Sequence, residues 1–171
     1  PVVLATPSNE TICSGTSTGI ALSSTPAGAT FAWTVTESGS SGASAGSGSS
    51  INQTLSATGA AVGTTTYTVT PTLAGCPGLP VDFVVTINPA PVVVATPAAQ
   101  AICTGATTGI SLTSNPSGAT FTWTANAVGV NGATNGSGSS LAQTLTSTSG
   151  GTVTYTITPS LNGCVGPTSD A

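Results

Sequence analysis

The chain has 171 residues, with no Lys, Arg or His and only four acidic residues, so its formal net charge is −4. Nucleic acids and anionic membranes both attract proteins through cationic side chains, so this composition excludes both partners. A nucleophilic Ser or Thr needs a basic neighbour, and neither His nor Lys is present to serve as one.

The sequence repeats itself. PVVLATP at Pro1–Pro7 returns as PVVVATP at Pro91–Pro97, and the landmarks that follow recur in the same order. A period this long fits complete domains better than the shorter units of a solenoid. We therefore predict two domains, residues 1–88 and 89–171. The chain contains no Met, and we expect it to be a processed or excerpted piece of a longer protein.

Alternating apolar and polar residues predict short strands, and frequent Pro and Gly leave no room for long helices. Between the strands, the Gly- and Ser-rich stretches 37–50 and 127–140 are expected to be mobile surface loops. Six or seven strands with turns between them predict an all-β sandwich in each copy. The expected strands of the first copy are Val2–Ala5, Gly19–Leu22, Phe31–Val35, Ile51–Ala57, Thr64–Pro71 and Val81–Ile87.

The aromatic residues lie on alternating strands and are expected to face inward, because the cores have few other large side chains. A sugar-binding module would instead need an aromatic side chain in an exposed loop. The predicted core aromatics are Phe31, Trp33, Tyr67, Phe121, Trp123 and Tyr155.

Each copy contains two cysteines, and we predict that Cys13 pairs with Cys76 and Cys103 with Cys164. A metal site would need clustered ligands, whereas the chain has no His and no CxxC motif. Each disulfide would close a loop of roughly 60 residues and stabilise a small domain by about 4 kcal/mol. Paired thiols also predict an oxidising compartment.

The acidic residues do not predict a catalytic or metal site. Glu10 and Glu37 correspond to Gln100 and Ala127 in the second copy, so the two copies would not share a carboxylate pair. Asp82 and Asp170 are equivalent, but one carboxylate per domain is too few to bind calcium tightly. We predict no enzyme activity, no catalytic residue, no metal site and no cofactor.

The second copy differs from the first at its end. The first copy finishes with VDFVVTINP at Val81–Pro89, whereas the second reaches only Asp170 and Ala171, the counterparts of Asp82 and Phe83. We therefore expect the second domain to lack most of its last strand. Either the chain is cut from a longer array, or a neighbouring chain donates that strand.

Several sequence runs occur in a characteristic order: CSG, GIAL, PAGATFAWT, GSGSSINQTL, TYTVTPTLAGC and VVTINP. This order resembles the PKD-like, immunoglobulin-like repeats of large Bacteroidetes cell-surface proteins, of which gliding-motility adhesins exported by type IX secretion are examples. The resemblance covers both copies almost end to end. It implies an array of extracellular β-sandwiches that extends an adhesin from the cell surface.

These observations predict a non-catalytic structural repeat in the stalk or filament of an extracellular bacterial adhesin. One alternative is a filament subunit that polymerises by donor-strand exchange at the open edge of the second repeat, and a lesser one is a carbohydrate-binding module. Expected partners are further copies of the repeat or neighbouring subunits, and a surface glycan or another cell-surface ligand. No direct insertion into a membrane is expected.

Overall fold

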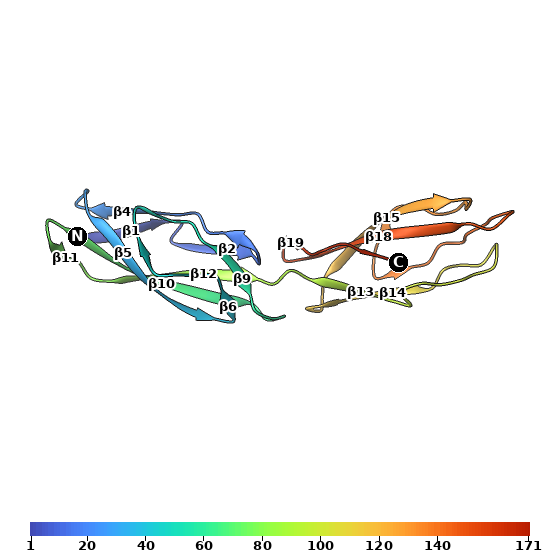
Figure 1. Ribbon diagram of the computed structural model, residues 1–171, viewed down its shortest axis with the longest axis horizontal. Coiled ribbons are helices and arrows are strands. Elements are labelled where there is room, and N and C mark those ends of the chain that lie inside the picture. Colours follow the sequence, from blue (N-terminus) through green and yellow to red (C-terminus); the bar gives the residue numbers. More distant parts are fainter. The chain divides into compact units, whose positions relative to one another are not determined.

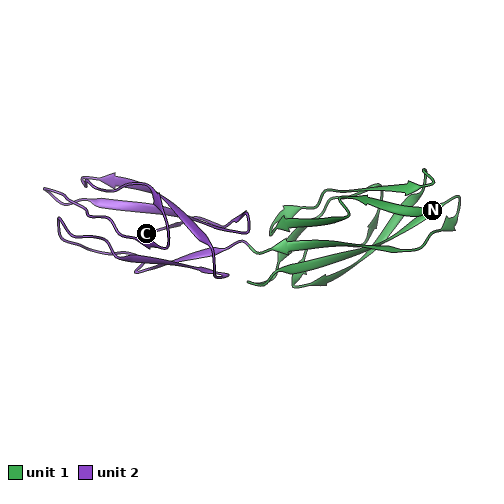
Figure 2. Cartoon of the chain, turned by 180° about the vertical axis from the view of Figure 1, so that it is seen from behind, with its two compact units in different colours: residues 1–89 green, residues 90–171 purple.

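A computed structural model describes all 171 residues, and its regular elements are β-strands (Figure 1). The chain divides into two compact units, Pro1–Pro89 and Ala90–Ala171 (Figure 2). Each unit is an immunoglobulin-like sandwich, which confirms the predicted all-β fold of two tandem domains. The structure contains no helix long and apolar enough to span a membrane.

The first unit is built from three sheets. The largest has the order β2-β12-β10-β5-β7, with β11 also paired to β10, and the other two have the orders β1-β4-β8 and β3-β9-β6. The strands are β1 (Val2–Thr6), β2 (Asn9–Cys13), β3 (Thr16–Ser17), β4 (Ile20–Thr25), β5 (Thr30–Ser38), β6 (Ser40–Ser41), β7 (Gly46–Ser47), β8 (Ser50–Ile51), β9 (Thr54–Ala57), β10 (Gly63–Leu73), β11 (Cys76–Pro77) and β12 (Val81–Asn88).

The core of the first unit is formed by the inward-facing residues of its strands. Along β10 the burial alternates residue by residue, with Tyr67 and Val69 fully buried, as a half-covered antiparallel strand requires. From the sheet β1-β4-β8, Val3, Ile20 and Ile51 join the same apolar cluster.

The second unit repeats this plan with fewer strands. Its sheets have the orders β13-β14-β17 and β16-β15-β18-β19, and β20 pairs with β18 where β12 pairs with β10 in the first unit. The strands are β13 (Val92–Thr96), β14 (Ile110–Asn115), β15 (Thr120–Val128), β16 (Gly136–Ser137), β17 (Ser140–Leu141), β18 (Thr152–Leu161), β19 (Cys164–Val165) and β20 (Ser169–Asp170). Strand β20 covers only the beginning of the strand that β12 forms in the first unit, as predicted from the end of the sequence at Ala171.

The Gly- and Ser-rich stretch 37–50 is not a featureless loop. It contains the short strands β6 and β7, and β7 pairs with the Trp33 strand. The indole Nε1 of Trp33 donates a hydrogen bond to the carbonyl of Ser44 at 3.2 Å. A Cβ on Gly46 would lie 2.8 Å from the Trp33 ring, so Gly is required where this segment crosses the indole.

The structure differs from the predicted strands at two other places. The predicted strand Ile51–Ala57 is divided into β8 and β9, because Gln53 leaves the ladder and hydrogen-bonds with Ser44 and Tyr67. Strand β2 was not predicted, because NETIC shows no clear alternation. It forms by parallel pairing with β12, a long-range contact that local sequence does not encode.

Candidate functional site

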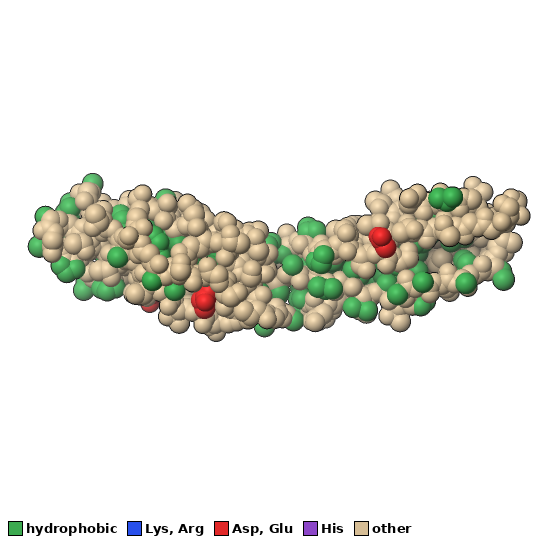
Figure 3. Space-filling model, viewed as in Figure 1, with side chains coloured by type: hydrophobic (Ala, Val, Ile, Leu, Met, Phe, Trp, Pro, Cys, Tyr) green, Lys and Arg blue, Asp and Glu red, His purple; other side chains and the backbone are tan.

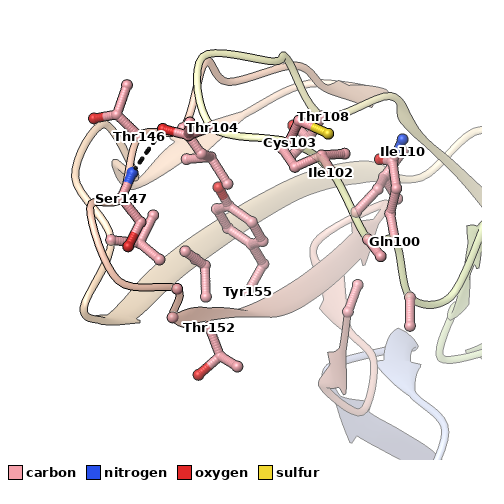
Figure 4. Close-up of a pocket in the computed structure, with 18 of the residues that line it drawn as sticks. Gln100, Ile102, Cys103, Thr104, Thr108, Ile110, Thr146, Ser147, Thr152 and Tyr155 are labelled. Atoms are coloured by element: carbon pink, nitrogen blue, oxygen red, sulfur yellow. Dashed lines mark hydrogen bonds between the residues drawn. The ribbon is translucent and has the colours of Figure 1, made fainter.

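A groove of about 590 Å³ runs along the open edge of β18 in the second unit. On one side lies the edge of β18, and on the other lies the coil 99–103. Ile102, Leu145, Val153 and Tyr155 provide much of its apolar lining. In Figure 4 the coil that carries Gln100, Ile102 and Cys103 lies across from the strand that carries Thr152 and Tyr155.

The first unit shows what occupies the equivalent space. There β12 lies between β10 and β2, antiparallel to the first and parallel to the second. Its inward side chains Val85 and Ile87 are fully buried. The groove of the second unit therefore corresponds to the space that the second half of β12 fills in the first unit.

Residues beside this space are more exposed than their counterparts in the first unit. Gly63 and Thr65 of β10 are buried. Of their counterparts, Gly151 is exposed and Val153 is half-buried. Leu55 belongs to the first apolar core, but its counterpart Leu145 lies outside the second core cluster and lines the groove. The groove thus exposes residues that the first unit keeps in its interior.

The edge of β18 that faces the groove carries main-chain polar groups beyond its pairing with β20. Tyr155 and Ala171 exchange two hydrogen bonds, of 2.9 and 3.0 Å. In an antiparallel ladder the groups that face one neighbour recur at every second residue. The N–H and C=O of Val153 therefore point toward the groove, where no strand of this unit pairs with them.

The opposite wall keeps its position without a strand beside it. Gly109 N–H donates to Oε1 of Gln100 at 2.9 Å, as Gly19 N–H donates to Glu10 at 3.2 Å in the first unit. The bond from Gly105 N–H to the Leu145 carbonyl is 2.8 Å long, as is its counterpart in the first unit. The coil 99–103 is therefore held at both ends, although it forms no strand.

A Tyr–Gln–Thr network lies beside the groove and recurs in both units. The Tyr155 hydroxyl donates to Oε1 of Gln143 at 2.9 Å, and Gln143 N–H donates to Oγ1 of the buried Thr108 at 2.9 Å. Tyr67 and Gln53 form the same bond in the first unit, also at 2.9 Å. Sequence reasoning missed this network, although both copies carry Gln-Thr-Leu at that point.

Both phenols are held in the protonated form. Burial raises the pKa of Tyr67 to about 12, and the nearby carboxylates of Glu37 and Glu10 add to the rise. Burial also raises the pKa of Tyr155. Each neutral hydroxyl can donate to its Gln partner, so these tyrosines have a structural role.

The acidic side chains act singly as hydrogen-bond acceptors. Oδ1 of Asp82 accepts from Thr68 at 2.6 Å, and Oδ1 of Asp170 accepts from Thr156 at 2.8 Å. Glu37 accepts from the N–H of Ala43 at 2.8 Å. No three His, Cys, Asp or Glu side chains are grouped as ligands for a metal ion. Gln100 occupies the position of Glu10 and accepts the equivalent hydrogen bond from the backbone. The two copies therefore share the hydrogen bond at this position but not the charge.

The predicted cysteine pairs are wrong. Cys76 and Cys103 carry free, exposed thiols, whereas Cys13 and Cys164 are each disulfide-bonded. Neither Cys13–Cys76 nor Cys103–Cys164 can therefore form in this structure.

Strand geometry explains this error in the first unit. Cys13 ends β2 beside Asn88, near the first residue of β10, whereas Cys76 pairs with Leu73 at the other end of β10. Eleven residues of β10 separate the two ends by about 30 Å at the usual rise per residue. A disulfide allows only about 7 Å between Cα atoms.

The six predicted core aromatics are all buried. The Trp123 indole also donates to the Thr134 carbonyl at 3.2 Å, as Trp33 does to Ser44. No aromatic side chain is among the exposed large hydrophobic residues, which are all Val or Leu. The face in Figure 3 shows isolated acidic side chains and scattered apolar ones among uncharged polar groups.

A comparison with protein families finds the PKD-like domain twice, over residues 10–91 and 100–170. The chain belongs to the PKD-like domain family. Domains of this family are generally non-catalytic, extracellular structural or adhesion modules. A comparison with curated proteins finds no match to the chain. Both PKD-like repeats carry equivalent core aromatics and the same Tyr–Gln–Thr network.

Proposed function

We propose that the two PKD-like repeats are a length of the non-catalytic stalk of a bacterial surface adhesin or filament. The tandem match to a family of extracellular structural domains carries this proposal. The sequence runs shared with Bacteroidetes surface repeats, such as PAGATFAWT and TYTVTPTLAGC, favour an adhesin of the gliding-motility type exported by type IX secretion.

The surface of the repeats agrees with a spacer that works outside the cell. The interior positions recur between the copies, whereas the exposed positions hold mostly Thr, Ser, Gly and Ala and no basic residue. Such a surface resists trypsin, which needs Lys or Arg. The expected partners are further copies of the repeat or neighbouring subunits, which would be joined along exposed strand edges.

Immunogold labelling of intact cells that make the protein tests this proposal. An antibody against the 171-residue chain should label structures that project from the cell surface, and proteinase K added outside the cells should remove the label. Label found only in permeabilised cells would contradict the proposal.

A glycan array separates the stalk from a carbohydrate-binding module. Because the aromatic residues are buried, we expect no saturable binding to any glycan. Specific binding to one glycan class would favour the carbohydrate-binding function instead.

A further inference from the structure

The two free cysteines of the chain occupy positions whose counterparts in the other repeat are disulfide-bonded. Cys103 is the counterpart of Cys13, and Cys76 is the counterpart of Cys164. Cys13 and Cys164 are disulfide-bonded, whereas Cys76 and Cys103 carry exposed thiols. Each of the two positions therefore occurs once in a disulfide and once as a free thiol.

We infer that the Cys103 thiol of one copy of the chain and the Cys76 thiol of a second copy form an intermolecular disulfide. The partner is a second copy of the same chain, and the bond joins unlike cysteine positions of the two copies. This inference rests on the proposed stalk function for the oxidising surroundings outside the cell. It deepens that function, because it names the groups through which copies of the chain are joined.

A disulfide within one repeat is excluded by the length of the central strand. In the first repeat Cys13 and Cys76 lie at opposite ends of β10. In the second repeat Cys164 pairs with the last residue of β18, whereas Cys103 lines the groove together with Thr152, the first residue of β18. A strand of this length spans about 30 Å, and a disulfide allows only about 7 Å between Cα atoms. Each free thiol therefore needs a partner outside its own repeat.

The backbone around Cys76 already has the form that it has around the disulfide-bonded Cys164. Cys76 pairs with Leu73 across a tight turn, as Cys164 pairs with Leu161. In both turns the residue after the Leu has a φ of 50°. Formation of a disulfide at Cys76 therefore requires no change of the turn that carries it.

The backbone around Cys103 likewise matches that around the disulfide-bonded Cys13. Gly105 follows Cys103 by two residues and has a φ of 84°, and Gly15 has the same φ after Cys13. Both Gly N–H groups donate to a Leu carbonyl at 2.8 Å. The thiol of Cys103 is therefore presented from the same turn as its disulfide-bonded counterpart.

Small and uncharged residues leave both thiols open to a second copy. A Cβ added to Gly75 or to Gly105, which lie next to Cys76 and two residues after Cys103, would meet no atom within 4 Å. No acidic residue adjoins either cysteine in the sequence. Neither a bulky neighbour nor a like charge therefore keeps the two thiols apart.

The reaction needs a disulfide oxidant, which a glutathione redox buffer supplies as oxidised glutathione. The Cys103 thiolate attacks one sulfur of oxidised glutathione, forms a mixed disulfide and releases one glutathione thiolate. The Cys76 thiolate of the second copy then attacks the Cys103 sulfur and releases the second glutathione. The two protein thiols lose two electrons and two protons, and the two glutathione molecules carry them away.

Two single variants test the pairing of unlike positions. Cys76→Ser leaves Cys103 as the one free thiol, and Cys103→Ser leaves Cys76. Each variant, and an equimolar mixture of the two, is incubated in the glutathione buffer and analysed by non-reducing electrophoresis. We expect the mixture to form disulfide-linked dimer roughly 10-fold faster than either variant alone, which is a modest preference for one orientation. Both substitutions replace exposed side chains, so unchanged melting temperatures check that the variants fold.

The unsubstituted chain carries both thiols and should form dimers, trimers and longer species that a reductant returns to monomer. Chymotrypsin digestion and mass spectrometry should find the peptides of Cys76 and Cys103 joined to each other.

Three results would overturn the inference. Equal rates for the mixture and the single variants would mean that the thiols react at random, and absence of dimer in the mixture would mean that they do not meet. An unsubstituted chain that loses both thiols but stays monomeric would mean that Cys76 and Cys103 pair within one chain. These results concern the purified chain, whereas the surface label concerns the stalk, so the two proposals fail separately.

Discussion

The two repeats of this chain share a core but differ in their strands: β20 spans only Ser169–Asp170, and the counterparts of β2, β3, β6 and β9 form no strand in the second repeat. In the first repeat β12 completes the sheet, and the segment 9–13 forms the parallel strand β2 beside it. In the second repeat the corresponding segment 99–103 is a coil, although similar hydrogen bonds hold its ends. In this comparison β2 occurs only where β12 lies beside it, and the sheet β3-β9-β6 is reduced to the isolated bridges Thr107–Thr144 and Asn131–Thr146 in the second repeat.

The largest effect is expected from weakening β12 itself. Ile87→Ala removes a fully buried side chain and should lower the free energy of unfolding of the first repeat by about 2–5 kcal/mol. Thermal and denaturant unfolding would measure the loss. The control is Val84→Ala on the partly buried face, which should cost much less. Equal losses for the two variants would contradict the assigned facing of β12.

A second prediction concerns a contact that both repeats share. Gly46→Ala and Gly136→Ala would each place a Cβ within 2.8 Å of a Trp ring. We expect each to cost about 1–3 kcal/mol of stability. Gly59→Ala is the control, because a Cβ there meets no atom within 4 Å. Near-equal melting temperatures for all three variants would show that the Gly–Trp contact is not tight.

The two tyrosines should titrate at different pH values. Tyr67 has a pKa of about 12, raised by burial and then by Glu37 and Glu10, whereas burial alone raises the pKa of Tyr155. Ultraviolet titration should show Tyr155 ionising first, and Tyr→Phe variants would assign each step. Tyr67 binds its proton more tightly in the folded state, so its contribution to stability is complete below pH 10. That contribution should fall between pH 10 and 12, and Tyr67→Phe should remove it.

The smallest effect is expected at the turn after β10. Ala74 has a φ of 50°, and in the second repeat Asn162 occupies the same conformation. Asn tolerates the left-handed region better than Ala. Ala74→Asn should therefore raise the melting temperature by an amount equivalent to less than about 1 kcal/mol, and Asn162→Ala should lower it. A lower melting temperature for Ala74→Asn, or a higher one for Asn162→Ala, would contradict this prediction.

The fold could be predicted from the sequence because alternating strands and Pro- and Gly-containing turns are local patterns, and both occur in each copy. Alternation along Thr64–Pro71 placed Tyr67 in the core, and comparison of the copies placed Tyr155 in the equivalent position. The cysteine pairs could not be deduced, because the spacing between Cys13 and Cys76 does not reveal that a full-length strand separates them. Strand β2 depends on long-range pairing with β12, which no local pattern in NETIC indicates.

Amide hydrogen exchange of the 171-residue chain tests most directly the claim that β2 forms through its pairing with β12. Residues 9–13 and 99–103 occur in the same molecule and can be followed in the same experiment. We predict that residues 10–13 are protected through their pairing with β12, whereas residues 99–103 exchange at close to the rate of an unstructured peptide. Equal protection of the two segments would show that β2 does not need β12, and it would contradict this claim.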